Sequence, residues 1–241
     1  MDKIALITGC NSMIGIAIAR RLLEDNFCII AHYHKSVERL KRLFCQYKDK
    51  EIYLIKANLC TSGVDKIISY IEKIERCPTL LVNNAASTYG EMTLENMDKK
   101  ILSNTFELNL FAPAMLSAKF FERMKKKGGK IVNISSIGAK YGGGQTTMHY
   151  GMSKAALDAL TINLARQGAP YKILVNSIRP GVVDTDFHSR YTPNKSMKKR
   201  VKLIPLERMA KPEEIAAMVG LLASQDGDFI TGEIISIAGG D

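Results

Sequence analysis

The sequence predicts a single α/β domain, built as a doubly wound parallel sheet of about seven strands with helices on both faces. Two observations predict this fold. Short apolar, β-branched runs alternate along the chain with segments whose apolar residues recur at helical spacing. The 241 residues, 46% of them hydrophobic, are enough to bury one full core. No internal repeat or linker interrupts the pattern, so residues 1–241 are expected to fold as one unit.

Composition argues against several classes of protein. No apolar run approaches the roughly 18 residues of a membrane span, and the N-terminus runs directly into a predicted strand, so we expect no signal peptide. The five cysteines are odd in number and lack a CxxC pair, and no spacing among the four histidines suggests a metal site. We therefore expect reduced thiols in a cytoplasmic protein, without a metal or a membrane partner.

The chain is basic, with a formal net charge of +10 and lysines and arginines concentrated in residues 123–130 and 195–202. Such runs are usually solvated faces, and the alternative is a docking surface for an acidic partner or an anionic substrate. Neither run interleaves aromatic residues or accompanies a nucleic-acid-binding motif, so no nucleic acid partner is expected.

The first strand, turn and helix favour a dinucleotide. Residues 3–8 are an apolar run that ends in Thr8-Gly9, and residues 14–23 follow with helical spacing. Backbone N–H groups at such a helix start, with the helix dipole behind them, favour a pyrophosphate. A purely structural strand–turn–helix is the alternative. The candidate cofactor-binding residues here are Gly9, Asn11, Ser12, Met13, Ile14 and Gly15.

The end of the second predicted strand, residues 27–33, favours NADP(H) over NAD(H). An NAD-binding fold normally offers Asp or Glu here to the ribose 2′-hydroxyl, and no acid occurs between Phe27 and Val37. Lys35 and Ser36 supply a cation and a hydroxyl that suit a 2′-phosphate. Tyr33 and His34 are close enough to take part. A loop with two ordinary surface residues is the alternative.

The middle of the chain continues the alternation of strands and helices. We expect helices over residues 36–47, 64–74, 94–106 and 108–124, and strands over residues 51–57, 79–82 and 130–135. Asn84 and Ala85 follow the fourth strand at its carboxyl end, where ligands bind in open parallel sheets. Ser136 follows the fifth strand, and its hydroxyl can donate to a carbonyl oxygen that becomes more negative as hydride arrives.

Tyr150 and Lys154 lie one turn apart on the same face of the next predicted helix, residues 150–167. A phenol normally keeps its proton until about pH 10. An ammonium beside it favours the phenolate, so this tyrosine can exchange a proton nearer neutral pH. Taken alone, the pair also fits a solvated helix face, but its context favours chemistry.

The remaining segments complete the pattern. We expect strands over residues 173–178 and 229–237 and a helix over residues 212–222, which begins with a proline in its first turn. Between them, residues 186–209 turn polar and basic.

In this order, these pieces resemble the short-chain dehydrogenase/reductase family over nearly all 241 residues. The matching residues are Thr8-Gly9 with Gly15, Asn83-Asn84-Ala85, Asn109, Ser136, Tyr150 with Lys154, Pro180-Gly181, Thr231-Gly232 and Gly239-Gly240. The resemblance implies that Tyr150 protonates a developing alkoxide. It implies that Lys154 lowers the phenol pKa and contacts the nicotinamide ribose, that Ser136 holds the carbonyl oxygen, and that Asn109 distorts its helix and holds a relay water.

The resemblance also implies further cofactor contacts. Asn58 and Leu59 are expected beside the adenine, and the nicotinamide end is expected to meet Pro180, Gly181, Val183 and Thr185. Residues 186–209 correspond to the substrate lid. Met13 stands where the family usually has its middle glycine and Ala86 where it usually has Gly. We interpret Met13 as an adaptation, because some pteridine reductases also carry a large residue there.

The overall resemblance is greatest to 3-oxoacyl-(acyl carrier protein) reductases. It implies NADPH-dependent reduction of a small-molecule or carrier-linked ketone, with basic residues 125–127 and Lys172 meeting an acidic acyl carrier protein. A sugar, polyketide, secondary-metabolite or pteridine-like substrate stays open, as does an NADP-binding sensor without chemistry. We also expect a homotetramer or homodimer formed through the two long helices and the last strand.

Overall fold

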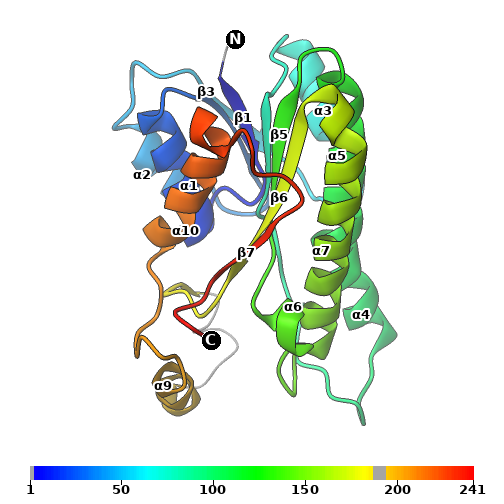
Figure 1. Cartoon of the computed structure of the whole chain (residues 1–241), viewed down its shortest axis with the longest axis vertical. Helices are drawn as coiled ribbons and strands as arrows, with labels where there is room; N and C mark the ends of the chain where they lie inside the picture. Colours follow the sequence, from blue (N-terminus) through cyan, green and yellow to red (C-terminus); the bar gives the residue numbers. More distant parts are fainter. Residues whose placement is uncertain (1–2, 187–193) are drawn as a thin grey trace.

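The computed structural model describes residues 3–186 and 194–241 and confirms the predicted fold (Figure 1). Within these ranges one parallel sheet has seven strands in the order β3-β2-β1-β4-β5-β6-β7. Their bounds are β1 Ile4–Ile7, β2 Cys28–Tyr33, β3 Ile52–Lys56, β4 Leu80–Asn83, β5 Gly129–Ile134, β6 Ile173–Pro180 and β7 Ile234–Ile237.

Strand β1 lies at the point where the strand order reverses. Leu6 pairs with Ile30 of β2 on one side and with Leu81 of β4 on the other. All four residues of β1 are buried, as expected for a parallel strand covered on both faces. In open α/β sheets the ligand crevice forms outside the carboxyl ends of the strands at such a reversal.

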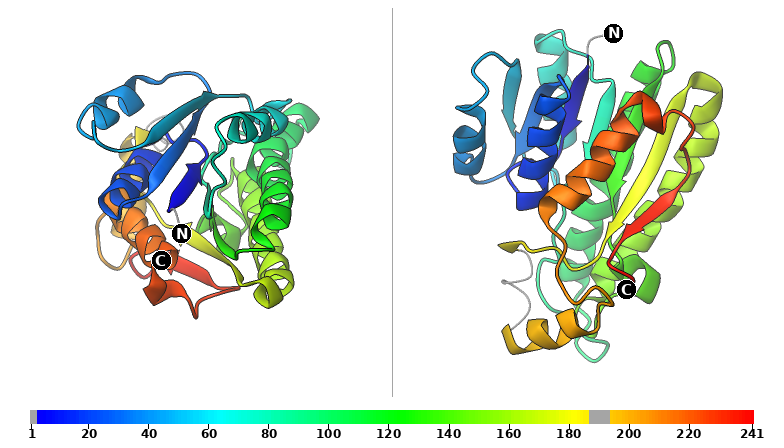
Figure 2. Two further views of the ribbon diagram at one scale, coloured as in Figure 1. Left: turned by 90° about the horizontal axis from the view of Figure 1, so that it is seen from above. Right: turned by 60° about the vertical axis from the view of Figure 1, so that its left-hand side comes forward.

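Helices cover both faces of the sheet (Figures 1 and 2). One face carries α1 (Met13–Glu24), α2 (Glu38–Phe44) and α10 (Pro212–Ala223), and the other carries α3 (Gly63–Lys73), α4 (Lys99–Phe106), α5 (Ala112–Met124) and α7 (Met148–Gly168). The short helices α6 (Gly138–Tyr141) and α9 (Asn194–Lys202) lie at the end of the molecule where the strands finish, the lower end in Figure 1.

Two apolar cores hold these layers together. Leu22 of α1 and Val219 of α10 are fully buried in the first core, on one face of the sheet. Ile67 of α3 and Phe120 of α5 are fully buried in the second core, on the other face. Removing large side chains such as these from water supplies the main driving force for folding.

Two predicted starts were wrong by five residues each. The helix expected over residues 94–106 begins only at Lys99, because the Asp98 carboxylate caps it by accepting from Lys100 N and Ile101 N. The last strand, expected from residue 229, begins at Ile234. Side chains bond to the residues before it: Asn176 donates to Ile230 O and accepts from Glu233 N. Backbone bonds to β6 begin at Gly232, whose N–H donates to Val175 O.

The predicted single helix over residues 108–124 has two parts. A π-helical turn, Glu107–Phe111, precedes α5 and contains Asn109. The resemblance predicted a local distortion at this residue, and the π-helical turn confirms it. Such turns are rare and are frequent at functional sites.

Several other expectations concern the surface. Among the described helices none is both long and apolar enough to cross a bilayer. Phe111, Met115, Met152 and Ile162 leave roughly half of their surface exposed, as an interface through the long helices requires, and the oligomeric state stays a prediction for light scattering. The expected lid, residues 186–209, includes residues 187–193, which lie outside the described ranges; the rest contains α9.

Candidate active site

Ser136 and Tyr150 meet at the carboxyl end of β5. Ser136 lies two residues beyond the strand, and Tyr150 stands in the first turn of α7. The Ser136 hydroxyl accepts from Gly138 N at 3.1 Å and is hydrogen-bonded to the Tyr150 hydroxyl. The loop between them packs so tightly on α7 that a Cβ on Gly151 would lie 2.4 Å from Gly143 N. The chain therefore needs glycine here to bring the two hydroxyls together.

The Tyr150 phenol keeps its proton in this structure. Burial raises its pKa to about 12, and the hydrogen bond from Ser136 opposes that rise. The expected lowering by Lys154 is not seen in the chain alone, where the Lys154 Nζ lies 5.8 Å from the Tyr150 ring centroid. A protonated phenol beside a hydroxyl is suited to donating a proton.

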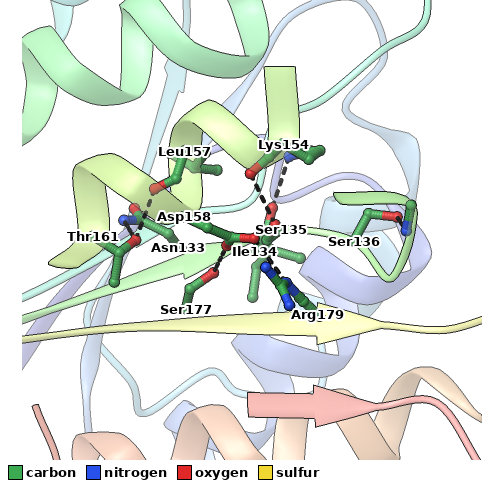
Figure 3. A network of polar contacts seen from close by, with 11 residues as sticks. Asn133, Ile134, Ser135, Ser136, Lys154, Leu157, Asp158, Thr161, Ser177 and Arg179 are labelled. Atoms are coloured by element: carbon green, nitrogen blue, oxygen red, sulfur yellow. Dashed lines mark hydrogen bonds and ion pairs between the residues drawn. The ribbon is translucent and has the colours of Figure 1, made fainter. Parts of the chain in front are cut away.

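Lys154 is buried on the face of α7 that packs against the sheet. Its Nζ donates to the Ile134 carbonyl at 2.7 Å (Figure 3). Burial lowers its pKa to about 8, and the negative charge of Asp158 opposes this fall. The ammonium form is therefore favoured up to a mildly alkaline pH, directly behind Tyr150.

Asn109 positions backbone around the site. Its Oδ1 accepts from Ser87 N at 3.0 Å, and its Nδ2 donates to Ser87 O at 2.9 Å and to Ser153 Oγ at 3.0 Å. The Ser153 hydroxyl in turn donates to Tyr150 O. Asn109 thus joins the loop after β4 to the catalytic helix, while its expected role in a water relay stays a prediction.

The turn after β1 is built against the loop after β4. Gly9 has φ +59°, and a Cβ there would lie 2.8 Å from Ala85 Cα. The Thr8 hydroxyl accepts from Asn84 N at 2.9 Å and from Ala85 N at 3.1 Å. Asn84 Nδ2 donates to Thr8 O and Gly9 O. Asn84 therefore connects the turn after β1 with the loop after β4, on either side of the crevice.

The N-terminus of α1 fits a cofactor phosphate. Ser12 caps the helix by accepting from Gly15 N at 3.0 Å, and Met13 is its first residue. In the described hydrogen bonds, the Met13 and Ile14 N–H groups donate to no protein acceptor, as expected of a helix start that binds an anion. The Asn11 Oδ1 is buried without a partner. Met13 thus enters the helix without disturbing the turn.

The predicted 2′-phosphate residues lie together beyond β2. His34, Lys35 and Ser36 are exposed, and Tyr33 is partly buried against the first core. Among the described side chains Lys35 makes no ion pair. The structure adds Arg39, which is paired with Asp186 at this edge. In the sequence, only its position four residues after Lys35 indicated that Arg39 could lie near this site. Arginine and lysine side chains of this kind are suited to binding a phosphate dianion.

The other expected cofactor residues divide between backbone and packing roles. The Gly181 N–H donates to Ile237 O, and the Thr185 hydroxyl donates to Val183 O. Asn58 Oδ1 is occupied by Cys60 N at 3.1 Å. Val183 and Leu59 are buried in the two cores, so any contact they make with a cofactor falls to their backbone. Pro180, also buried, ends β6.

His32 was missed by the sequence analysis. It lies 2% exposed in β2, where Nδ1 accepts from Gly9 N at 3.1 Å and Nε2 donates to Ala57 O at 3.1 Å. Burial lowers its pKa to about 4, so the imidazole is neutral and ties the cofactor turn to the ends of β2 and β3. The feature of the sequence that could have indicated this role is a polar residue inside an otherwise apolar strand.

We predict that His32 makes the fold acid-sensitive. Between its ordinary pKa of 6.5 and its native pKa of about 4, the unfolded chain binds a proton that the native chain does not. Stability is therefore lost as the pH falls through this window, by up to about 3 kcal/mol. Urea unfolding at pH 7 and pH 4.5 should show a smaller loss for His32→Gln than for the natural chain. Equal losses would refute the assignment.

The sequence matches known proteins over its full length. A family model described as enoyl-(acyl carrier protein) reductase matches residues 9–241. The oxidoreductase YmfI of Bacillus subtilis is 30% identical over 249 residues, which cover 100% of this chain and 99% of that protein. Dehydrogenase/reductase SDR family member 4 of Bos taurus is 30% identical over 245 residues, 99% of this chain and 87% of that protein.

Solved structures share the whole fold. A blue fluorescent protein from a metagenomic library, in complex with NADPH, aligns with a TM-score of 0.90 and 28% identity, over 99% of this chain and 97% of that one. YwfH, an NADPH-dependent reductase involved in bacilysin biosynthesis, aligns with a TM-score of 0.91 and 25% identity, over 100% and 98%. The match over residues 9–241 and the 30% identity over the whole chain show that this protein belongs to the short-chain dehydrogenase/reductase family of oxidoreductases.

Proposed function

We propose that this protein reduces a ketone to a secondary alcohol with NADPH. One observation carries the proposal: the hydroxyl of the partly buried Tyr150 is hydrogen-bonded to Ser136, and the buried Lys154 follows one turn later on the same helix. The three side chains lie at the carboxyl edge of the sheet, beside the turn between β1 and α1. When bound, NADPH supplies the hydride that the carbonyl carbon accepts.

The chain's own residues handle the oxygen and the proton. Ser136 donates a hydrogen bond to the carbonyl oxygen, which gains negative charge as the carbon is reduced. Tyr150 gives its proton to that oxygen, so the alcohol leaves neutral and a phenolate is left behind. The Lys154 ammonium stabilises this phenolate by its charge. Bulk water then returns the proton to Tyr150.

The preference for NADPH over NADH rests on the end of β2. Lys35 offers a cation there, Arg39 lies nearby in an ion pair with Asp186, and the segment between Phe27 and Val37 contains no carboxylate. Among related structures, the metagenomic fluorescent protein was solved with NADPH and YwfH is described as NADPH dependent. A third, 4-hydroxyisoleucine dehydrogenase, was solved with NADH, so the choice depends on these side chains rather than on the fold.

For the substrate, we propose an anionic or carrier-linked 3-oxoacyl thioester. The described part of α9 carries Lys198, Lys199 and Lys202, which are exposed and make no ion pair among the described residues. This helix lies at the same end of the molecule as α6 and the active site (Figure 1). Exposed Leu203 and Leu206 follow it, so the surface suits an acyl chain with a negatively charged handle.

The basic residues 125–127 lie elsewhere. They precede β5, at the end of the strand opposite to Ser136, and Lys125 is paired with Glu122. Within one chain, α9 is therefore the basic surface nearer the catalytic residues. The contact between an acyl carrier protein and residues 125–127 with Lys172 stays a prediction.

A ketone of secondary metabolism is the alternative substrate. The observation that favours it is the likeness to YwfH, which is involved in bacilysin biosynthesis and covers nearly the same length. It would keep the roles of Ser136, Tyr150 and Lys154 and change only the surface that recognises the rest of the molecule.

Tyr150→Phe is predicted to lower kcat for ketone reduction by about 10²–10⁴-fold, because it removes the proton donor. NADPH binding, followed by the change in cofactor fluorescence, should be largely unchanged, because the aromatic ring stays in place and only the hydroxyl is lost. Acetoacetyl-CoA and a simple diketone are suitable substrates. Turnover that survives the substitution would remove Tyr150 from its role.

Lys35→Glu is predicted to raise the KM for NADPH about tenfold or more, because it replaces a charge-assisted contact with repulsion. The KM for NADH should change little. Lys66→Glu, at an exposed position on α3, is the matched control. A natural chain that prefers NADH, or a Lys35 variant with equal losses for both cofactors, would contradict the 2′-phosphate assignment.

Charge reversal on α9 tests the substrate surface. Lys198→Glu together with Lys199→Glu should raise the KM for acetoacetyl-CoA about tenfold and leave a neutral diketone unaffected. Lys126→Glu together with Lys127→Glu is the matched control, and it should leave the KM for acetoacetyl-CoA unchanged. It should raise the KM of a carrier-linked substrate only if an acidic carrier protein docks there. Equal effects of the α9 change on the charged and neutral ketones would argue against an anionic handle.

A further inference from the structure

A second buried charge lies one turn beyond Lys154 on the same helix. The Asp158 side chain is only 4% exposed, and its two carboxylate oxygens have different partners. Oδ1 accepts from Ser177 Oγ at 2.7 Å, and Oδ2 accepts from Arg179 Nε at 2.8 Å (Figure 3). Both carboxylate oxygens are thus satisfied by strong donors, as a buried carboxylate requires. The proposed reaction gives this carboxylate no role.

The partners of Asp158 belong to the strand that leads to the cofactor crevice. Arg179 and Ser177 lie on β6, and Pro180 follows Arg179 directly. Beside them Ile178 of β6 pairs with Ile134 of β5, whose carbonyl holds the Lys154 ammonium at 2.7 Å. The ion pair therefore joins α7 to the sheet immediately below the catalytic lysine.

The Ser135 hydroxyl closes the same network from β5. It donates to the Lys154 carbonyl at 3.2 Å (Figure 3). Lys154 is thus held at its backbone by Ser135 and at its ammonium by Ile134, with Asp158 as the neighbouring negative charge. Burying a carboxylate is costly unless its charge is paired, and the contacts with Arg179 and Ser177 are what allow Asp158 to lie one turn from Lys154.

We propose that Asp158, fixed by Arg179 and Ser177, is a positioning residue that keeps Lys154 in its ammonium form during proton transfer. The inference rests on the role proposed above for Lys154. Burial alone favours the neutral amine, and a neutral amine would not stabilise the Tyr150 phenolate. The carboxylate supplies the opposite charge without touching the substrate.

Few other charged groups near Lys154 could keep it in its ammonium form. On α7, the neighbouring titratable groups are Tyr150, which is protonated, and Asp158. From β6 the one described charge is Arg179, which would disfavour an ammonium if Asp158 were absent. The hydrogen-bond partners of Lys154 on the sheet are uncharged: the Ile134 carbonyl accepts from its ammonium, and the Ser135 hydroxyl donates to its backbone carbonyl. Asp158 also appears as the charge that raises the pKa of Lys154 against burial.

The test follows the titration of Lys154 directly, without substrate or cofactor. Protein labelled with ¹³C at lysine Cε is titrated by NMR, and the Lys154 signal is assigned by its absence from Lys154→Arg. Asp158→Asn keeps the acceptor for Ser177 and removes the charge. We expect the midpoint to fall by about one pH unit, the effect of a lost unit charge several ångströms away at an effective dielectric constant near 20. The alkaline limb of kcat for ketone reduction should move down equally.

Two further variants separate charge from structure. Arg179→Gln leaves the carboxylate uncompensated and should move the Lys154 midpoint upward. The double change Asp158→Asn with Arg179→Gln removes the buried pair together, which restores much of the stability lost by breaking it, and should still lower the midpoint. Asp228→Asn breaks the remote Lys130–Asp228 pair and should leave the midpoint unchanged.

The outcomes are distinct. Opposite shifts for the Asp158 and Arg179 variants support the inference. A Lys154 midpoint that stays constant in all the folded variants would overturn it, even where stability or kcat falls. A shifted midpoint in a protein that reduces no ketone would instead leave the charge coupling intact and overturn the proposed function.

Discussion

The hydrogen bonds of Asn84 with Thr8 and Gly9 join the carboxyl ends of β1 and β4 where the strand order reverses. Without these bonds, nothing in the sheet itself would hold the turn after β1 against the loop after β4. These bonds fix the loop after β4, and Asn109 fixes it again from the π-helical turn through Ser87. Because Asn109 also bonds Ser153 on α7, the cofactor turn and the catalytic helix are held by one continuous set of buried polar contacts. Hydrogen bonds that connect in this way restrict the motion of the loops that they join.

Burial decides the proton chemistry. It raises the pKa of Tyr150 and lowers that of Lys154, so desolvation holds the phenol protonated while weakening the charge that must later stabilise its phenolate. Ser136 opposes the first effect and Asp158 the second. The two groups proposed to be catalytic therefore lie in a low-dielectric site where single charges act strongly. For each of them, one neighbour opposes the effect of burial on its pKa.

Helix α7 carries polar residues on the face that a soluble helix normally makes apolar. Lys154, Asp158 and Thr161 follow at helical spacing and are all buried against the sheet. Each has a partner there: the Ile134 carbonyl, the Arg179 guanidinium, and the Asn133 amide that donates to the Thr161 hydroxyl at 2.8 Å. Polar contacts between α7 and the sheet thus accompany the apolar packing of Ala165 with Ile131 and Val175 in the second core.

The sequence alone determined the α/β class and the order of strands and helices, because periodicity is a local property of a chain. Its resemblance to a known family proposed the roles of Asn109, Ser136, Tyr150 and Lys154. It placed Tyr150 and Lys154 on one helix face, since four residues make about one turn. It did not reveal the buried roles of His32, Asp158 and Arg179, whose partners are distant in sequence. It also misjudged the start of α4 and β7, where Asp98 and Asn176 offer side-chain bonds that compete with regular structure. Only the tertiary structure decided the protonation states, because these depend on how much water each group loses when the layers pack.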